Sequence, residues 1–405
     1  MITNVSTLPS SGTCAVLIDR IGPYHFARLS ALAGRVRTVA IESFGMDATY
    51  AWSKISEAGA FERCTLLEQA GAGSAQENEL VKLVAQALTR FAPSVVAIPG
   101  WSEKSALAAL RWCLQTRTPA ILMCASSGVG RQRRGWREFV KRRIVRLFSA
   151  GLGGGKPQVD YLEALGLTRA RIFSGYNVVD NRYFADHAQV AREDALRQRA
   201  KLGLPENYFL SVCRLVDEKN LPRLLEAYAD YRREAGAGAW KFVLLGDGPL
   251  QPALIAQRER LGIAADFLMP GFKQYAELPA YYGLANAFVL ASVAETWGLV
   301  VNEAMACGLP VLVSTHCGCA ADLVAEGRNG FTFDPADTSA LSRRMLDLTR
   351  GDGAAMGRAS REIIDRWSPD THAAHLQCAA DAARSVPQPR PGLLDRLLLW
   401  LLLKR

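Results

Sequence analysis

A chain of 405 residues is normally long enough for two domains, each with a hydrophobic core of its own. Hydrophobic residues make up 49% and charged residues 21%, a composition that excludes a disordered chain and is typical of a globular protein. No apolar run reaches the roughly eighteen residues of a membrane span. The first residues also lack the basic end and apolar stretch of a signal peptide, so we expect a cytoplasmic protein.

The cysteine content argues against a disulfide framework and against zinc. The nine cysteines are an odd number, and most stand inside apolar runs, which is typical of reduced thiols. Cys317 and Cys319 have the wrong spacing for a zinc knuckle and no partner pair. We therefore expect no metal site.

Apolar runs alternate with helix-like segments along the whole chain. Most runs are short and nearly continuous in Val, Ile, Leu and Phe, as expected of parallel strands covered on both faces. This pattern predicts two open, doubly wound α/β sheets. The expected strands are residues 14–18, 38–41, 95–98, 120–123 and 171–173 in the first half, and 209–213, 242–245, 267–269, 287–291, 311–314 and 331–333 in the second.

The polar, helical stretch of residues 187–204 is the expected linker between the sheets. It places the first domain at residues 1–186 and the second at residues 187–368. A last helix is expected to open with Ser368 as its cap and Pro369 in its first turn, and to run to about Arg384. A proline-rich break then separates an apolar tail, so residues 387–405 stand apart.

One loop and helix start in the second half have the geometry of an anion site. Glu295 and Glu303 stand eight residues apart, with Gly298 between strand and helix. First-turn amides of a helix are unpaired, and its dipole adds about half a positive charge, so the amides of Gly298, Leu299 and Val300 suit phosphate. The two carboxylates suit hydroxyl groups. The stretch therefore predicts a site for a nucleotide sugar, which has hydroxyls at both ends and a diphosphate between them.

This stretch resembles the E-x7-E signature of family 4 glycosyltransferases, which are retaining enzymes. The resemblance continues through residues 303–311 and the turn at residues 327–331. It implies the GT-B fold, with two Rossmann-like domains facing across a cleft, the acceptor on the side of the first domain and the donor on the second. It also implies that residues 369–386 form a helix that crosses back onto the first domain. An ordinary strand–helix unit with surface carboxylates is the alternative.

A second group of candidates follows the expected strand at residues 209–213. Arg214 and Lys219 can converge on one diphosphate, because Arg offers a planar fork of donors and Lys a compact charge. The segment resembles the family's G-R-L-x-x-E-K-G element, whose Arg and Lys hold the donor pyrophosphate; here Asn220 replaces the glycine. An exposed loop with scattered charges is the alternative.

The turn containing Gly246 and Gly248 resembles the family's G-x-G-P turn. It could bring the backbone close to the nucleotide, or it could be a simple turn before a helix.

Five residues of the first domain are candidates for the acceptor side or the cleft. Gly22 opens a helix after the first strand, and His25 follows it; His25 could bind a ligand or pack at the helix start. Trp101 could stack on a sugar face or pack. Lys156 is a cation in a glycine-rich loop. Asn177 lies in a stretch that resembles the family's N-x-V-D-x-x-x-F, where a capping role is equally expected.

Together these motifs predict a retaining, metal-independent hexosyltransferase with a nucleotide-diphosphate sugar as donor and a hydroxyl acceptor, in polysaccharide, glycolipid or glycoconjugate biosynthesis. Arg214 and Lys219 would neutralise the leaving diphosphate. Glu295 would fix the sugar ring, and Glu303 would accept from the ribose. The donor is a substrate, so no cofactor is expected, and two cations can do a metal's electrostatic work. The alternative is a non-catalytic nucleotide-sugar or glycan-binding protein with the GT-B fold.

The net charge of +9 is uneven, because residues 131–146 carry eight Arg or Lys against one acid, Glu138. This segment predicts an anionic partner, which we expect to be a membrane surface and not a nucleic acid. Six apolar residues fall on one face of the expected helix, and they suit a helix on anionic lipid and equally a helix packed in the first domain. They are Trp136, Phe139, Val140, Ile144, Leu147 and Phe148.

The tail at residues 393–405 is too short to span a membrane but suits an interfacial anchor. We therefore expect a glycan or lipid-linked acceptor and peripheral contact with the cytoplasmic face of a membrane.

Overall fold

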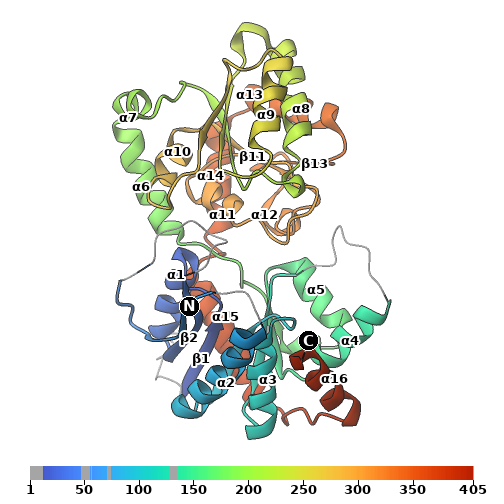
Figure 1. The fold of residues 1–405 in the computed structure, drawn as a ribbon. Coiled ribbons are helices and arrows are strands. Elements are labelled where there is room, and N and C mark those ends of the chain that lie inside the picture. The colour runs from blue at the N-terminus through green and yellow to red at the C-terminus, as the bar shows by residue number, and fades with distance from the viewer. Residues whose placement is uncertain (1–11, 47–54, 56, 71–73, 127–134, 405) are drawn as a thin grey trace. The chain divides into compact units, whose positions relative to one another are not determined.

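The computed structural model describes residues 12–46, 55, 57–70, 74–126 and 135–404. They belong to two compact units, which Figure 1 colours along the chain. The first unit contains the described residues of Met1–Ser126, Gln132–Val178 and Pro369–Arg405, and the second contains Val179–Ser368. None of the helices in the described part of the chain is long and apolar enough to cross a membrane.

The first unit is built on a seven-stranded parallel sheet in the order β3-β2-β1-β4-β5-β6-β7. Every strand expected in this half is present, and β3 and β6 are additional. The direction of strand addition reverses between β1 and β4, so the loops at their carboxyl ends lie at a topological switch point. The strands are β1 (Thr13–Ile18), β2 (Arg37–Met46), β3 (Glu62–Gln69), β4 (Val95–Pro99), β5 (Ala120–Cys124), β6 (Ala150–Gly153) and β7 (Ile172–Phe173).

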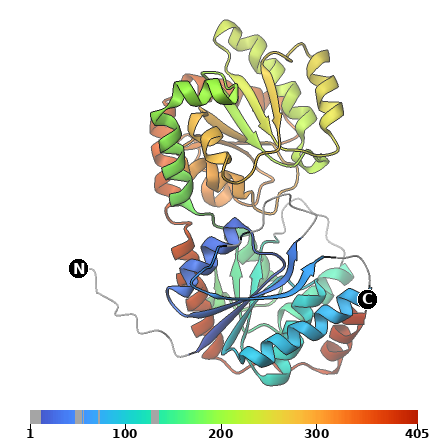
Figure 2. The same cartoon turned by 60° about the vertical axis from the view of Figure 1, so that its left-hand side comes forward.

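Helices cover both faces of this sheet, as Figure 2 shows. Side chains alternate along each strand, so Ala15 and Leu17 of β1 join the core on one face while Val16 and Ile18 join the core on the other. The first face is covered by α2 (Ser74–Phe91), α3 (Lys104–Thr116), α4 (Gly135–Val145) and α16 (Leu393–Lys404), and the second by α1 (Pro23–Ala33) and α15 (Pro369–Arg384). A short α5 (Lys156–Ala164) and the 3₁₀ turn η1 (Arg169–Arg171) complete the unit.

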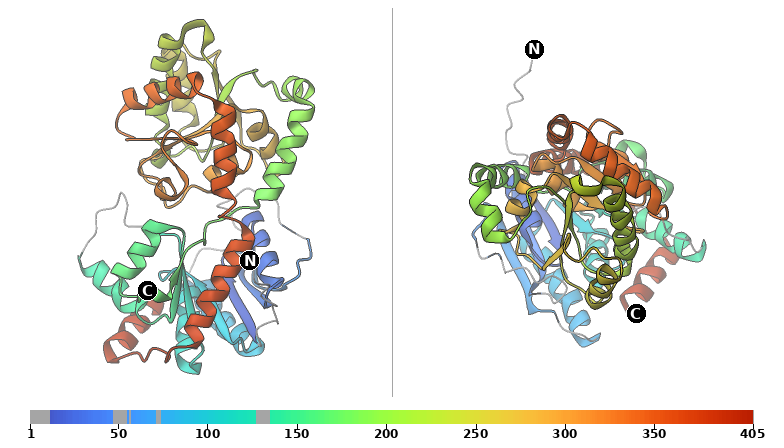
Figure 3. Two further views of the ribbon diagram at one scale, coloured as in Figure 1. Left: turned by 180° about the vertical axis from the view of Figure 1, so that it is seen from behind. Right: turned by 90° about the horizontal axis from the view of Figure 1, so that it is seen from above.

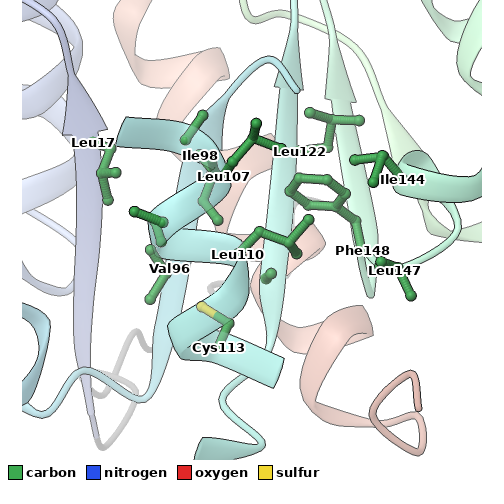
Figure 4. Packing of buried hydrophobic residues seen from close by; sticks show 14 of the residues in the cluster. Leu17, Val96, Ile98, Leu107, Leu110, Cys113, Leu122, Ile144, Leu147 and Phe148 are labelled. Atoms are coloured by element: carbon green, nitrogen blue, oxygen red, sulfur yellow. The ribbon is translucent and has the colours of Figure 1, made fainter. Parts of the chain in front are cut away.

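The apolar face expected for the basic segment is divided between core and surface. Ile144, Leu147 and Phe148 are buried, and Figure 4 shows them beside Leu122 of β5. Trp136 and Phe139 are exposed. The interpretation of all six apolar residues as one lipid-facing stripe is therefore wrong, because the second half of α4 is needed to cover the sheet. Residues 131–134 of the segment lie outside the described residues.

The second unit has a six-stranded parallel sheet in the order β10-β9-β8-β11-β12-β13. All the strands expected in this half are present. They are β8 (Tyr208–Val212), β9 (Lys241–Leu245), β10 (Phe267–Gly271), β11 (Ala287–Leu290), β12 (Val311–Ser314) and β13 (Gly330–Phe333). The helices are α6 (Asn181–Glu193), α7 (Ala195–Leu202), α8 (Leu221–Ala235), α9 (Gln251–Arg260), α10 (Leu278–Leu284), α11 (Leu299–Ala306), α12 (Ala320–Leu323), α13 (Thr338–Arg350) and α14 (Gly353–Ile364), with 3₁₀ turns η2 (Asp217–Lys219) and η3 (Gly236–Gly238).

The stretch expected to be a linker is helical and belongs to the second unit. Asp180 caps α6 by accepting from the backbone N–H of Tyr183 at 2.9 Å, and α6 then packs on α10. Phe184, Ala188 and Ala191 are buried along α6 at helical spacing. The units accordingly divide after Val178 and not after residue 186, because a polar sequence can still bury one helical stripe.

Candidate functional site

Two neighbouring loops of the second unit hold the residues with the strongest chemistry. β8 and β11 pair in parallel, and the direction of strand addition reverses between them. Their carboxyl ends therefore form a switch point, where open α/β sheets bind ligands. The loop after β8 carries Lys219 in η2, and the loop after β11 carries Glu295. The backbone N–H of Val293 donates to the carbonyl of Glu218 at 2.9 Å, which joins the two loops.

Lys219 and Glu295 form an ion pair, with 16% of each side chain exposed. Burial alone would lower the pKa of Lys219, but the charge and the hydrogen bond of Glu295 together raise it above its usual value. The ammonium is therefore held in its charged form. The structure thus brings together two residues that stand 76 positions apart in the chain.

The backbone of Glu295 is held from the other side by the loop after β12. Its N–H donates to the carbonyl of His316 at 3.3 Å, and its carbonyl accepts from Gly318 N–H at 3.0 Å. The imidazole Nδ1 of His316 lies 3.0 Å from the carbonyl oxygen of Val293. Glu295 is thus positioned by backbone contacts, which leaves its carboxylate as the group that can exchange partners.

Arg214 is exposed at the carboxyl end of β8, on the same loop as Lys219. Gly246 and Gly248 lie directly behind this loop with positive φ angles of 139° and 156°. A Cβ at Gly246 would collide with the carbonyl oxygen of Cys213, and one at Gly248 with the backbone of Leu215. Both glycines are therefore required by packing of the loop, and their contact with a donor stays a prediction.

Asn220 replaces the family's glycine directly after Lys219, and the structure explains how. Its φ of 57° is left-handed, a conformation that Asn adopts more readily than other side chains. Its amide nitrogen also donates to the carbonyl of Pro335 at 2.8 Å, in a buried position. Asn220 thus keeps the turn that a glycine would give and anchors it to the loop after β13.

The start of α11 presents first-turn amides at the same edge of the sheet. Gly298 precedes the helix with a φ of 103°, which only glycine adopts easily, and Leu299 and Val300 are the first helical residues. Trp297 donates from its indole nitrogen to the side-chain oxygen of Asn302 at 2.9 Å in a buried bond. This bond fixes the turn between Glu295 and the helix.

Glu303 lies on α11 but is fully buried. The hydroxyl of Tyr282 on α10 donates to its Oε2 at 2.6 Å. Burial raises the pKa of Tyr275, and the Glu303 carboxylate raises it further, which places a second tyrosine close by. The sequence offered no signal for Tyr282, because a tyrosine in an apolar helix is usually a core residue. Its bond to Glu303 makes it part of the site.

In the first unit, the five candidates follow carboxyl ends of β1, β4, β6 and β7. Gly22 is the N-cap of α1, and its backbone N–H donates to Nδ1 of His25 at 3.3 Å. Burial, Arg28 and His372 lower the pKa of His25 well below its usual value, so the ring is neutral and can accept this bond. His25 therefore has the structural role of a helix cap, and a ligand role stays a prediction.

The other candidates have internal contacts as well. Trp101 packs edge-on against Tyr161 with ring centroids 6.1 Å apart. Lys156 is exposed and pairs with Asp160 at 2.6 Å. Asn177 is buried, and a Cβ at Gly154 would collide with its amide nitrogen, so Gly154 makes room for it. These contacts explain the residues structurally without assigning a ligand.

Within the part of the chain that the structure describes, no group of three or more His, Cys, Asp or Glu side chains is arranged to hold a metal ion. Burial raises the pKa of Cys213 to about 11, and it raises the pKa of Cys317 too. Both thiols are thus protonated.

Comparison with known proteins decides what this arrangement belongs to. Residues 193–362, which contain Lys219, Glu295 and Glu303, match the family described as glycosyl transferases group 1. The match covers most of the second unit. The group 1 match covers the loops after β8 and β11 and the whole of α11.

Two curated proteins that are similar to this chain are a sulfoquinovosyl transferase and a glucosyldiacylglycerol synthase by their names. Sulfoquinovosyl transferase SQD2 from Arabidopsis thaliana is 33% identical over 182 residues, which are 44% of this chain and 34% of that protein. Alpha-monoglucosyldiacylglycerol synthase from Acholeplasma laidlawii is 32% identical over 136 residues, 33% of each chain. The chain thus spans about a third of the length of these two relatives.

Solved structures extend the likeness in fold to nearly the whole chain. HepE from Anabaena in complex with UDP matches with a TM-score of 0.67 and 18% identity, covering 92% of this chain and 100% of that one. At this identity the likeness shows the fold alone. The chain has the GT-B fold, with two Rossmann-like α/β domains.

Proposed function

We propose that this protein is a retaining glycosyltransferase that moves a hexose from a nucleotide-diphosphate sugar to a hydroxyl acceptor in glycolipid or polysaccharide biosynthesis. The observation that carries the proposal is the Lys219–Glu295 pair at the β8–β11 switch point, inside a glycosyl transferases group 1 domain. In this pair the ammonium of Lys219, which would bind the diphosphate, lies beside the carboxylate of Glu295, which would bind the sugar.

Charge on the leaving diphosphate is the largest electrostatic demand of the reaction. Lys219 and the exposed Arg214 meet it from one loop, and the amides at the start of α11 meet it from the other. Two cations and a helix N-terminus supply the stabilisation for which other transferases use a metal ion, so we propose a metal-independent reaction. Chelation with EDTA should therefore leave turnover unchanged.

Binding of the donor exchanges the partners of Lys219. Its ammonium turns from Glu295 to the diphosphate, and Glu295 then accepts hydrogen bonds from the sugar hydroxyls. Glu303 accepts from the ribose, held in place by Tyr282. Attack on the same face of the sugar as departure, assisted by the leaving phosphate oxygen, retains the configuration without a covalent nucleophile.

No residue of the site identifies the acceptor. The proposal for the acceptor rests on the names of similar proteins. SQD2 is a sulfoquinovosyl transferase, and the Acholeplasma protein is an alpha-monoglucosyldiacylglycerol synthase. HepE was solved with UDP and with UDP-glucose. We propose a uridine diphosphate hexose as the first donor to test and a lipid-linked or glycan hydroxyl as the acceptor.

The test is release of nucleoside diphosphate from a panel of nucleotide sugars, with and without acceptor. Lys219→Ala and Arg214→Ala should lower turnover about 100- to 1000-fold while donor binding weakens far less, because both cations act mainly on developing charge. Lys201→Ala on α7, an exposed lysine outside the site, is the matched control and should keep full turnover.

Two outcomes would contradict the proposal. If both site variants keep near-native turnover, the diphosphate site is elsewhere. If the wild-type chain binds a donor in calorimetry but releases no product with any acceptor, the protein is a non-catalytic nucleotide-sugar-binding protein with the same fold.

A further inference from the structure

The inner side of the last helix, α16, is part of the first unit. Leu399 and Leu403 are buried in the core that α3 and α4 cover. Asp395 lies on the same side and pairs with Arg143 of α4 at 2.7 Å. The tail is therefore a docked helix with an internal ion pair, and only Arg405 lies outside the described residues.

The outer side of α16 is also apolar, although no described residue covers it. Leu393 is 88% exposed, Leu397 50%, Trp400 49% and Leu401 48%. Positions i, i+4, i+7 and i+8 share one helical face, so these four side chains form one stripe, which we call the outer face of α16. A helix that is apolar on two opposite sides needs a second environment besides the core of its own unit.

The charges around the outer face are positive. Arg396 and Lys404 are exposed, and the ammonium of Lys404 lies 4.3 Å from the ring centroid of Trp400. The acidic side chain of α16, Asp395, is turned inward and neutralised by Arg143. Cations beside an apolar stripe with a tryptophan are the pattern of a helix that lies in the headgroup region of an anionic bilayer.

We propose that the outer face of α16 docks the first unit onto an anionic lipid bilayer. The helix would lie in the surface with Leu393, Leu397 and Leu401 below the headgroups, Trp400 at their level, and Lys404 and Arg396 against lipid phosphate. Docking needs no movement of α16, because its inner side is already held by the core.

Neighbouring α4 extends this surface. Its first turns expose Trp136 and Phe139, and α4 and α16 lie on the same side of the first unit in Figure 1 and in both views of Figure 3. The ion pair between Arg143 and Asp395 joins the two helices.

A second copy of the chain fits the outer face less well than lipid does. A stable protein interface takes about 800 Å² and roughly 20–30 residues from each partner. One twelve-residue helix with a short apolar stripe offers far less, and pairing two copies would also bring like charges together.

The experiment is co-sedimentation of the full chain with vesicles of phosphatidylcholine alone or with roughly one third phosphatidylglycerol. The wild-type protein should bind the anionic vesicles, and less so as salt rises. The double variant Leu397→Gln with Leu401→Gln should lower the vesicle–water partition coefficient at least about tenfold. The reason is that each substitution removes the favourable free energy of moving a leucine side chain from water into the bilayer. The matched control is Leu196→Gln on α7, where the leucine is 87% exposed, and it should bind as wild type does.

Equal binding of the double variant, or equal binding to neutral vesicles, would overturn the proposal. So would a dimer in light scattering that the double variant splits and that ignores vesicles, since a second copy would then occupy the face. Circular dichroism and thermal unfolding check that the variants fold. Donor hydrolysis without vesicles is measured in parallel, so failure of docking and failure of the transferase proposal are told apart.

Discussion

At the scale of single residues, the site depends on side chains whose partners come from distant parts of the chain. The two carboxylates of the E-x7-E signature differ in this respect. Glu295 shares a loop edge with Lys219 and is partly exposed, whereas Glu303 is buried behind Tyr282. We therefore expect substitution of the two glutamates to have different effects on nucleotide binding and on sugar transfer.

Glu303→Ala should weaken binding of free nucleoside diphosphate, because the ribose loses its acceptor. Glu295→Ala should leave that affinity nearly unchanged and impair sugar transfer. Tyr282→Phe should weaken nucleotide binding as Glu303→Ala does, but by less, since it removes one hydrogen bond worth roughly 1 kcal/mol. Calorimetric titration with the diphosphate checks this order. Equal loss in the two glutamate variants would reject the division of roles.

Asn220→Ala should destabilise the second unit by about 2 kcal/mol, through the left-handed backbone and the lost bond to Pro335. Asn220→Gly keeps the backbone conformation and should cost about half of that. Urea unfolding of both variants measures the difference. Similar values for the two would mean that the turn conformation contributes nothing.

At the scale of elements, α16 offers an internal comparison. Leu399→Ala should lower the free energy of unfolding of the first unit by about 2–5 kcal/mol, because it leaves a cavity in a packed core. Leu397→Ala, two positions earlier on the outer face, should change it by less than about 0.5 kcal/mol. Denaturant unfolding in the absence of lipid tests the pair. A small effect of Leu399→Ala would show that α16 is only loosely docked.

The elements that could be predicted from the sequence are those whose own residues carry the signal. Strands rich in Val, Ile and Leu were found, and so was α15, from its proline and cap. β6 was missed because Ala-Gly-Leu-Gly has a single large apolar residue, and it is a strand only because β5 and β7 pair with it. β3 was missed because it is an edge strand with half-buried side chains.

The same limit applies to the site. Motifs placed Lys219 and Glu295 on separate loops, but only the fold shows that they pair. The burial of Glu303 and its bond to Tyr282 could not be predicted, because the partner stands 21 residues away on a helix with no distinguishing pattern.

At the scale of the whole molecule, two buried histidines should make the stability of the first unit depend on pH. In the first unit, burial and the nearby Arg28 lower the pKa of His372 to about 3, and its Nδ1 lies 2.9 Å from the carbonyl oxygen of Gly175. His25 has a lowered pKa too. In the unfolded chain His372 has its ordinary pKa of about 6.5 and is protonated below that pH, whereas in the folded unit it stays neutral. The free energy of unfolding of the first unit therefore falls as pH falls below about 6.5.

Between pH 7.5 and pH 5 the first unit should lose about 2 kcal/mol through His372 alone. His372→Gln, which keeps a donor but cannot titrate, should lose less over the same range. Urea unfolding at both pH values, followed by a probe in the first unit, measures the slope of each protein. Parallel slopes would show that His372 is not the group responsible.

Under the proposed mechanism, the Lys219–Glu295 pair also has a consequence for the order of events in a catalytic cycle. A donor that takes the ammonium from Glu295 releases the carboxylate at the moment its own hydroxyls can use it. After transfer, the nucleoside diphosphate still occupies Lys219 but brings no sugar, so Glu295 is left without hydrogen-bond donors and competes to recover its lysine. In this proposed cycle, Glu295 would help to displace the spent nucleotide, and the re-formed ion pair would return the site to its starting state.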